Sequence, residues 1–185
     1  MRKFLILLTM ALLSENINAQ QLEGTYLASR EFHTLMNSFI EEDNVDVDFC
    51  LNFNKNVINI IVTIHVSSKE MDIDCNLTIP GTYQRTGDRM FCKFDKKSTG
   101  FTLTDIRSDD PEIKEVLNSE ESREGLYKLL EDMMREEMES EMSDISEVSD
   151  VFQRFTIKSQ TSNTITVILE DELEIRFLKQ ELLKP

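Results

Sequence analysis

The chain of 185 residues has no tryptophan, only five glycines and three prolines, and far fewer basic than acidic side chains, 20 against 35, for a net charge of -15. So little glycine and proline excludes collagen-like and low-complexity chains. The acidic excess repels nucleic-acid phosphates and anionic lipid surfaces, and no basic cluster offsets it, so we expect no nucleic-acid partner. Because 40% of the residues are hydrophobic, the composition is not that of a disordered protein, and we expect one globular domain with a packed core.

Signatures of catalysis are also scarce. The chain has two histidines, His33 and His65, and strand alternation places His65 on a solvated face. The G-x-S-x-G, Walker A, H-E-x-x-H, C-x-x-C and G-x-G-x-x-G motifs are all absent. We therefore predict that the protein is not an enzyme and uses no cofactor and no bound metal. A hydrolase whose site the sequence does not reveal is a remaining alternative.

The first nineteen residues have the organisation of a secretory signal peptide. Arg2 and Lys3 precede an apolar run over residues 4–13, and a polar stretch then leads to Ala19. That run is about half as long as a membrane span, which needs roughly 20 apolar residues. We therefore predict cleavage after Ala19, a single domain over residues 20–185, and export to the periplasm or the extracellular space. No later stretch is apolar enough for a transmembrane helix, so we expect no membrane span.

Over most of the chain, apolar and polar residues alternate as they do in half-buried β-strands. Residues 45–53 carry apolar side chains at odd positions and aspartate, cysteine or asparagine at even positions, which is a period of two. Pro80 and Gly81 predict a break in a later segment. Short turns and one solvated face favour antiparallel neighbours, and we expect about nine strands. The alternating segments are residues 24–32, 45–53, 57–66, 71–79 with 83–85, 90–94, 101–103, 155–157, 165–169 and 173–177.

A helical insertion interrupts the strands at about residues 110–148. Asp110 supplies an N-cap, and Pro111 fits the first helical position. Apolar side chains then recur at helical spacing in two stripes, the second over residues 126–134, which predicts two helices or one bent helix. Residues 131–150 hold nine acids against one arginine, so we expect a charged face. The methionines of this insertion either pack against the strands or form a stripe that binds a partner.

These patterns predict a mainly β protein with a helical insertion, folded as an antiparallel up-and-down β-barrel of about 8–9 strands. Leu22-Glu23-Gly24-Thr25-Tyr26 resembles the first-strand G-x-W motif of lipocalin-like (calycin) barrels, with Tyr26 where that family usually has tryptophan. The segment from Pro80 to Asp88 resembles the P-G-T-Y-x-R-x-G-D hairpin of small exported lipocalin-like proteins of Gram-negative bacteria. The resemblance implies a barrel with an apolar ligand cavity.

We therefore expect an exported binding protein that carries a small apolar ligand in the barrel interior. The alternative at each cavity position is a filled core, because eight strands enclose barely enough space for a ligand. A second alternative for the function is an interaction or inhibitor protein in which the acidic insertion meets a basic protein partner and the barrel is a scaffold. The residues expected to face the cavity are Phe49, Phe53, Ile60, Ile64, Met71, Cys75, Phe94 and Phe101.

The three cysteines allow at most one disulfide. Alternation directs Cys75 and Cys92 inward and Cys50 outward, and Cys50 lies two strand spacings, about 9.6 Å, from Cys75. A disulfide does not reach that far, so a Cys75–Cys92 bridge is the only plausible one.

Four aspartates alternate outward on two strands that one strand separates, and such carboxylates bind calcium or simply face solvent. The fixed loop spacing of a calcium site is absent, which favours the solvated strand face. These residues are Asp46, Asp48, Asp72 and Asp74.

Overall fold

A computed structural model of the chain describes residues 22–37, 44–138, 148–170 and 172–180. The predicted signal peptide lies outside this part, and its cleavage stays a prediction. The strands are β1 (Gly24–Ala28), β2 (Val45–Asn54), β3 (Val57–Ser67), β4 (Met71–Thr86), β5 (Arg89–Phe94), β6 (Gly100–Ser108), β7 (Arg154–Gln160), β8 (Thr164–Leu169) and β9 (Glu174–Lys179). Helices α2 (Arg30–Asn37), α3 (Pro111–Asn118) and α4 (Glu120–Met138) and the 3₁₀ turn η1 (Lys96–Ser98) accompany the strands, and residues 148–151 are helical as well.

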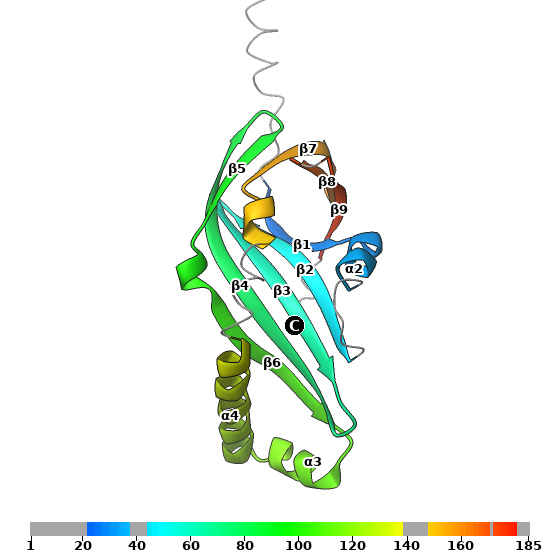
Figure 1. Cartoon of the computed structure of the whole chain (residues 1–185), viewed down its shortest axis with the longest axis vertical. Coiled ribbons are helices and arrows are strands. Elements are labelled where there is room, and N and C mark those ends of the chain that lie inside the picture. Colours follow the sequence, from blue (N-terminus) through cyan, green and yellow to red (C-terminus); the bar gives the residue numbers. More distant parts are fainter. Residues whose placement is uncertain (1–21, 38–43, 139–147, 171, 181–185) are drawn as a thin grey trace, which may run out of the picture.

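Eight of these strands close into a barrel. Their order is β3-β2-β1-β9-β8-β7-β5-β4, and β4 pairs with β3 to complete the ring. Every pairing is antiparallel, and β6 joins the sheet as a ninth strand beside β4. Figure 1 shows the barrel in the upper part of the molecule, with β2, β3, β4 and β6 continuing below it as a sheet. The prediction of a mainly β, antiparallel barrel with a helical insertion is confirmed.

The long strand β4 exchanges partners along its length. Residues 71–78 pair with β6, and residues 81–86 pair with β5. The predicted break at Pro80 and Gly81 is wrong, because β4 runs through both residues. Pro80 has no N–H to donate. It lies along β4 after the pairing with β6 ends and before the pairing with β5 begins, so no hydrogen bond to either strand is lost. A side chain at residue 81 would place its Cβ atom 2.8 Å from the Lys93 carbonyl oxygen, so glycine lets β5 approach at this point.

The first strand is shorter than predicted. β1 ends at Ala28, and α2 begins at Arg30, so the expectation of a strand over residues 24–32 is wrong at its second half. Phe32 is buried on α2, with its ring centroid 5.8 Å from that of Phe49. The apolar residues of this segment therefore follow a helical and not an alternating spacing, and α2 packs beside β2.

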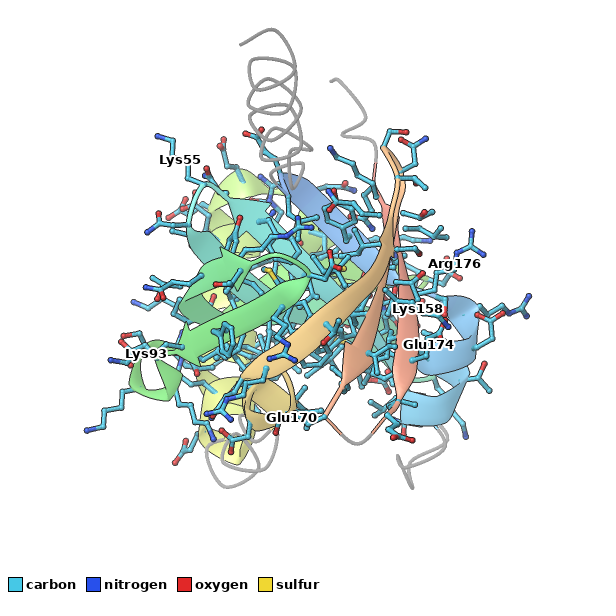
Figure 2. All side chains as sticks on the ribbon, turned by 90° about the horizontal axis from the view of Figure 1, so that it is seen from above. Lys55, Lys93, Lys158, Glu170, Glu174 and Arg176 are labelled. Carbon is cyan, nitrogen blue, oxygen red and sulfur yellow. The ribbon has the colours of Figure 1, made fainter. Side chains whose placement is uncertain are left out.

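Aromatic rings lie together in the buried core of the barrel. The rings of Phe49 and Phe152 stack at 5.0 Å between centroids, and Phe177 lies 6.4 Å from Phe152. A second group joins Tyr26 to Phe53 at 5.8 Å, and Phe53 to Tyr83 at 5.5 Å. Such pairs add about 0.5–1.5 kcal/mol each to the free energy of burial. Figure 2, which looks from above, shows the side chains on both faces of the strands.

In the part that the structure describes, up to residue 138, the helical insertion forms two separate helices, which is one of the two predicted arrangements. Asp110 caps α3 by accepting hydrogen bonds from the backbone N–H groups of Glu112 (2.8 Å) and Ile113 (3.2 Å). Helix α4 lies against the outer edge of β6, where the Tyr127 hydroxyl accepts a hydrogen bond from the Ile106 N–H at 3.1 Å. The helix therefore covers part of an edge that would otherwise be open to another strand. None of the helices in the described part of the chain could cross a membrane.

Candidate functional site

The eight residues predicted to face a cavity do not gather in one place. Six of them belong to the packed core, and Met71 and Phe94 are only half-buried. Phe94 lies opposite Gly81, ten residues along β4 from Met71, which corresponds to about 33 Å. The set thus extends from the barrel into the sheet below it. Ligand binding by these residues stays a prediction. The six core residues are Phe49, Phe53, Ile60, Ile64, Cys75 and Phe101.

The cysteines form no disulfide, so the Cys75–Cys92 bridge, which the sequence left as the only plausible one, is absent. Cys92 lies opposite Tyr83, eight residues along β4 from Cys75, or about 26 Å away. Burial raises the pKa of the Cys50 and Cys75 thiols to about 11 and that of Cys92 to about 12. All three thiols are therefore protonated at neutral pH, which makes them poor nucleophiles.

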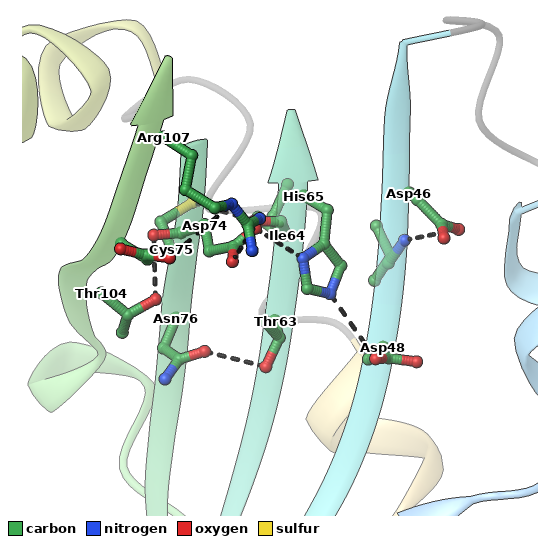
Figure 3. A network of polar contacts seen from close by, with 12 residues as sticks. Asp46, Asp48, Thr63, Ile64, His65, Asp74, Cys75, Asn76, Thr104 and Arg107 are labelled. Carbon is green, nitrogen blue, oxygen red and sulfur yellow. Dashed lines mark hydrogen bonds and ion pairs between the residues drawn. The ribbon is translucent and has the colours of Figure 1, made fainter. Parts of the chain in front are cut away.

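A row of charged side chains crosses the outer face of the sheet (Figure 3). His65 on β3 lies between Asp74 on β4 and Asp48 on β2. Its Nδ1 atom is 2.7 Å from Asp74 Oδ1, and its Nε2 atom is 3.5 Å from Asp48 Oδ2. The predicted outward direction of these side chains is confirmed. The sequence did not show that one histidine lies between two aspartates, because that depends on the strand register.

The two aspartates favour the charged form of His65. Burial lowers the pKa of His65, but the hydrogen bonds and negative charges of Asp74 and Asp48 outweigh this and raise it overall. The row continues to β6, where an Arg107 guanidinium nitrogen donates to Asp74 Oδ2 at 2.9 Å. The alternating charges link three strands and β6 across the surface.

The other histidine extends this row to α2. The Nε2 atom of His33 is 3.2 Å from Asp46 Oδ1 and 3.6 Å from Asp48 Oδ1. The nearby hydroxyls serve other groups, since Thr63 donates to Asn76 at 2.8 Å and Thr104 donates to the Asp74 carbonyl at 2.9 Å. Within the described ranges, no three His, Cys, Asp or Glu side chains are arranged to hold a metal ion. The contacts of His33 with Asp46 and Asp48 join α2 to the sheet.

The second notable surface is the solvent face of the helix pair α3–α4. Leu126, Leu130 and Met134 pack against the core on one side of α4. Leu129 and Met133 lie one turn apart on the other side and are 57% and 56% exposed. The two helices hold nine acidic residues, two in α3 and seven in α4, against four basic residues.

Two of these four cations are already paired. Lys114 lies 2.9 Å from Asp109, and Arg135 lies 2.8 Å from Glu131. The surface is therefore acidic around an exposed apolar pair. The sequence predicted this acidic face, although residues 139–147, which carry four more of these acids and Met142, lie outside the described part, and Asp150 pairs with Lys96 at 2.8 Å.

The fold thus defines the class of the protein, a closed eight-stranded antiparallel β-barrel with one extra strand and a helix pair against its edge. This architecture is compatible with a lipocalin-like barrel. No model of a known protein family matches the chain, and a search of curated proteins found no match either.

Proposed function

We propose that the protein is an exported, lipocalin-like barrel that acts as a scaffold and binds a basic protein partner through α3–α4. The observation that carries this proposal is the exposed pair Leu129 and Met133 on an acidic helix. The side chains of α4 that pack against the core are Leu126, Leu130 and Met134, and the exposed pair is not among them. Apolar side chains that are exposed together are typical of interaction sites.

The charge of the helices indicates the chemistry of the partner. Nine acidic residues on two helices attract a basic surface and disfavour an acidic one. Because the chain as a whole carries a charge of -15, long-range attraction speeds the approach of a basic partner from any side. The apolar pair then supplies the close contact. Methionine suits such a contact because its side chain is flexible and polarizable.

Two features support the scaffold role of the barrel. Phenylalanine and tyrosine rings pack against one another in the barrel core. The Tyr127 hydroxyl and Arg135 hydrogen-bond the edge of β6, which fixes the position of α4 on the barrel. The lipocalin-like assignment is supported by the closed barrel together with the motif that ends at Tyr26, and export is supported by the composition of residues 1–19.

Binding of a synthetic amphipathic helical peptide of lysine and leucine, followed by fluorescence anisotropy, tests the proposal. Leu129→Ser with Met133→Ser removes two contacts of about 1 kcal/mol each, so we expect the peptide to bind roughly 30-fold more weakly. Leu178→Ser on β9 is the matched control, because Leu178 is 45% exposed but lies on the barrel. Asp132→Lys on α4 should weaken binding as well, and most strongly at low salt.

Circular dichroism confirms that each variant is folded. Equal affinity of the Leu129→Ser/Met133→Ser variant and the Leu178→Ser control would overturn the proposal, and so would a failure of the unaltered protein to bind the peptide.

A further inference from the structure

We propose that a pocket on the outer wall of the barrel binds a small organic monocarboxylate with an apolar or planar body. The pocket has a volume of about 270 Å³ and lies where β5, β7 and β8 run side by side. In Figure 1 these strands are at the upper end of the molecule, whereas α3–α4 is at the lower end, so this site is separate from the partner-binding surface. The lining residues are Arg89, Met90, Phe91, Arg154, Phe155, Thr156, Ile168, Leu169 and Glu170.

The strand register arranges the outward side chains of the pocket in two rows. Arg89 lies opposite Thr156, which lies opposite Ile168 on the next strand. Phe91 lies opposite Arg154, and Glu170 follows β8 beside them. Figure 2 labels Glu170 at the rim of the wall. Each row thus combines one guanidinium group with one apolar side chain, an arrangement suited to a ligand with an anionic end and an apolar end.

The apolar part of the pocket is open to a ligand. Phe91 is 43% exposed, although phenylalanine is usually buried, and its ring faces out of the barrel. The floor is formed by strands whose inward side chains, Met90, Phe155 and Leu169, are buried in the core. The floor therefore belongs to the packed core, and the outward side chains of the same strands are the groups that contact a ligand.

The charges of the pocket select a monoanion. Among the described residues, Arg89 forms no ion pair, so its charge is available to a ligand. Most of the cations that do form ion pairs lie outside the pocket. Arg154 faces Glu170 at 3.7 Å, and both side chains are more than two-thirds exposed, which makes this pair weak. Two guanidinium groups and one carboxylate give the pocket a net charge of +1 in a strongly acidic protein. One carboxylate neutralises that charge, whereas a phosphate dianion would exceed it.

Guanidinium groups also match the planar geometry of a carboxylate, to which they donate two parallel hydrogen bonds. The Thr156 hydroxyl can donate a further one. Ile168 and the Phe91 ring then contact the body of the ligand, where an aromatic ring packs well. The volume is slightly below the range of about 300–1,000 Å³ for sites that hold drug-sized molecules, so the ligand is small.

Titration with benzoate, followed by calorimetry or by NMR shifts of the protein, tests the inference. We expect a Kd on the order of 1 mM for a ligand of this size. Arg89→Met keeps the apolar stem but removes the charge, and should weaken binding about tenfold. Glu170→Gln should strengthen it roughly two- to fivefold, because a repelling charge is removed. Arg176→Met, an exposed arginine on β9 labelled in Figure 2, is the matched control and should bind like the unaltered protein.

Phenyl phosphate serves as the second probe and should bind more weakly than benzoate. Tighter binding of phenyl phosphate would overturn the monocarboxylate assignment. Equal weakening by Arg89→Met and Arg176→Met would show that benzoate binding depends on the overall charge of the protein and not on this pocket, which overturns the inference. Binding that does not saturate by about 10 mM benzoate would refute the site. Because the lysine–leucine peptide binds a different surface, its result stays independent of this one.

Discussion

Phe152 offers the sharpest test of the packed barrel interior. Its side chain is 1% exposed and contacts the rings of Phe49, Phe155 and Phe177. It precedes β7, and its ring contacts join β7 and β9 to β2 across the core. Replacing it with alanine removes a whole ring from the centre of this cluster and leaves a cavity that the surrounding strands cannot fill.

The expected loss is large for a single substitution. Truncation of a buried phenylalanine to alanine costs about 3–5 kcal/mol. Three aromatic contacts are lost here, which places Phe152→Ala near the upper end, at about 4–5 kcal/mol. For a chain of this size, 1 kcal/mol corresponds to roughly 2–4 °C, so the melting temperature should fall by about 10 °C or more.

Urea and thermal unfolding followed by circular dichroism measure this loss, and the absence of tryptophan makes dichroism more suitable than intrinsic fluorescence. Phe91→Ala is the matched control, because the same ring is removed from a 43% exposed position. It should cost less than about 1 kcal/mol. Equal destabilisation by the two variants would refute the packed-interior reasoning.

Four further predictions follow from the sequence and the fold. Ile60→Asp buries an unpaired carboxylate and should cost several kcal/mol in urea unfolding, whereas Asn59→Asp on the opposite face should cost a few tenths; similar losses would contradict the strand parity. The pKa of His65 is raised in the fold, so its ion pairs stabilise the protein fully below the unfolded pKa near 6.5 and less as pH rises through the folded value. His65→Gln should therefore lose more stability at about pH 5.5 than at about pH 8.5, and a loss independent of pH would exclude the ion pairs. N-terminal sequencing of exported protein should begin at Gln20 or within a residue or two, and a start at Met1 would exclude cleavage. Organic extraction and mass spectrometry should give an empty extract, as a scaffold role requires, and recovery of a stoichiometric apolar molecule would instead favour ligand binding in the barrel.

Local patterns in the sequence determined most of the elements. Alternation over residues 45–53 predicts β2 because successive side chains of a strand point to opposite faces. Asp110 and Pro111 predict the start of α3 because capping involves neighbouring residues only. The acidic charge of α4 was predictable in the same way. The exposure of Leu129 and Met133, which carries the proposed function, was not, because the apolar stripe over residues 126–134 includes them together with the side chains that pack. The error at Phe32 arose because a short segment with few apolar residues fits a strand or a helix equally well.

Tertiary structure decided which of these elements meet. Pro80 and Gly81 mark a break in isolation, and only the exchange of β6 for β5 beside β4 makes them compatible with one continuous strand. His65 lies between two aspartates because of the register of three strands, which alternation alone does not fix. The pocket beside Phe91 depends on the pairing of β5 with β7, whose residues are distant in the sequence. Alternation and capping depend on a few neighbouring residues, whereas strand partners depend on the packing of the whole core and on the entropy of closing the loops between them.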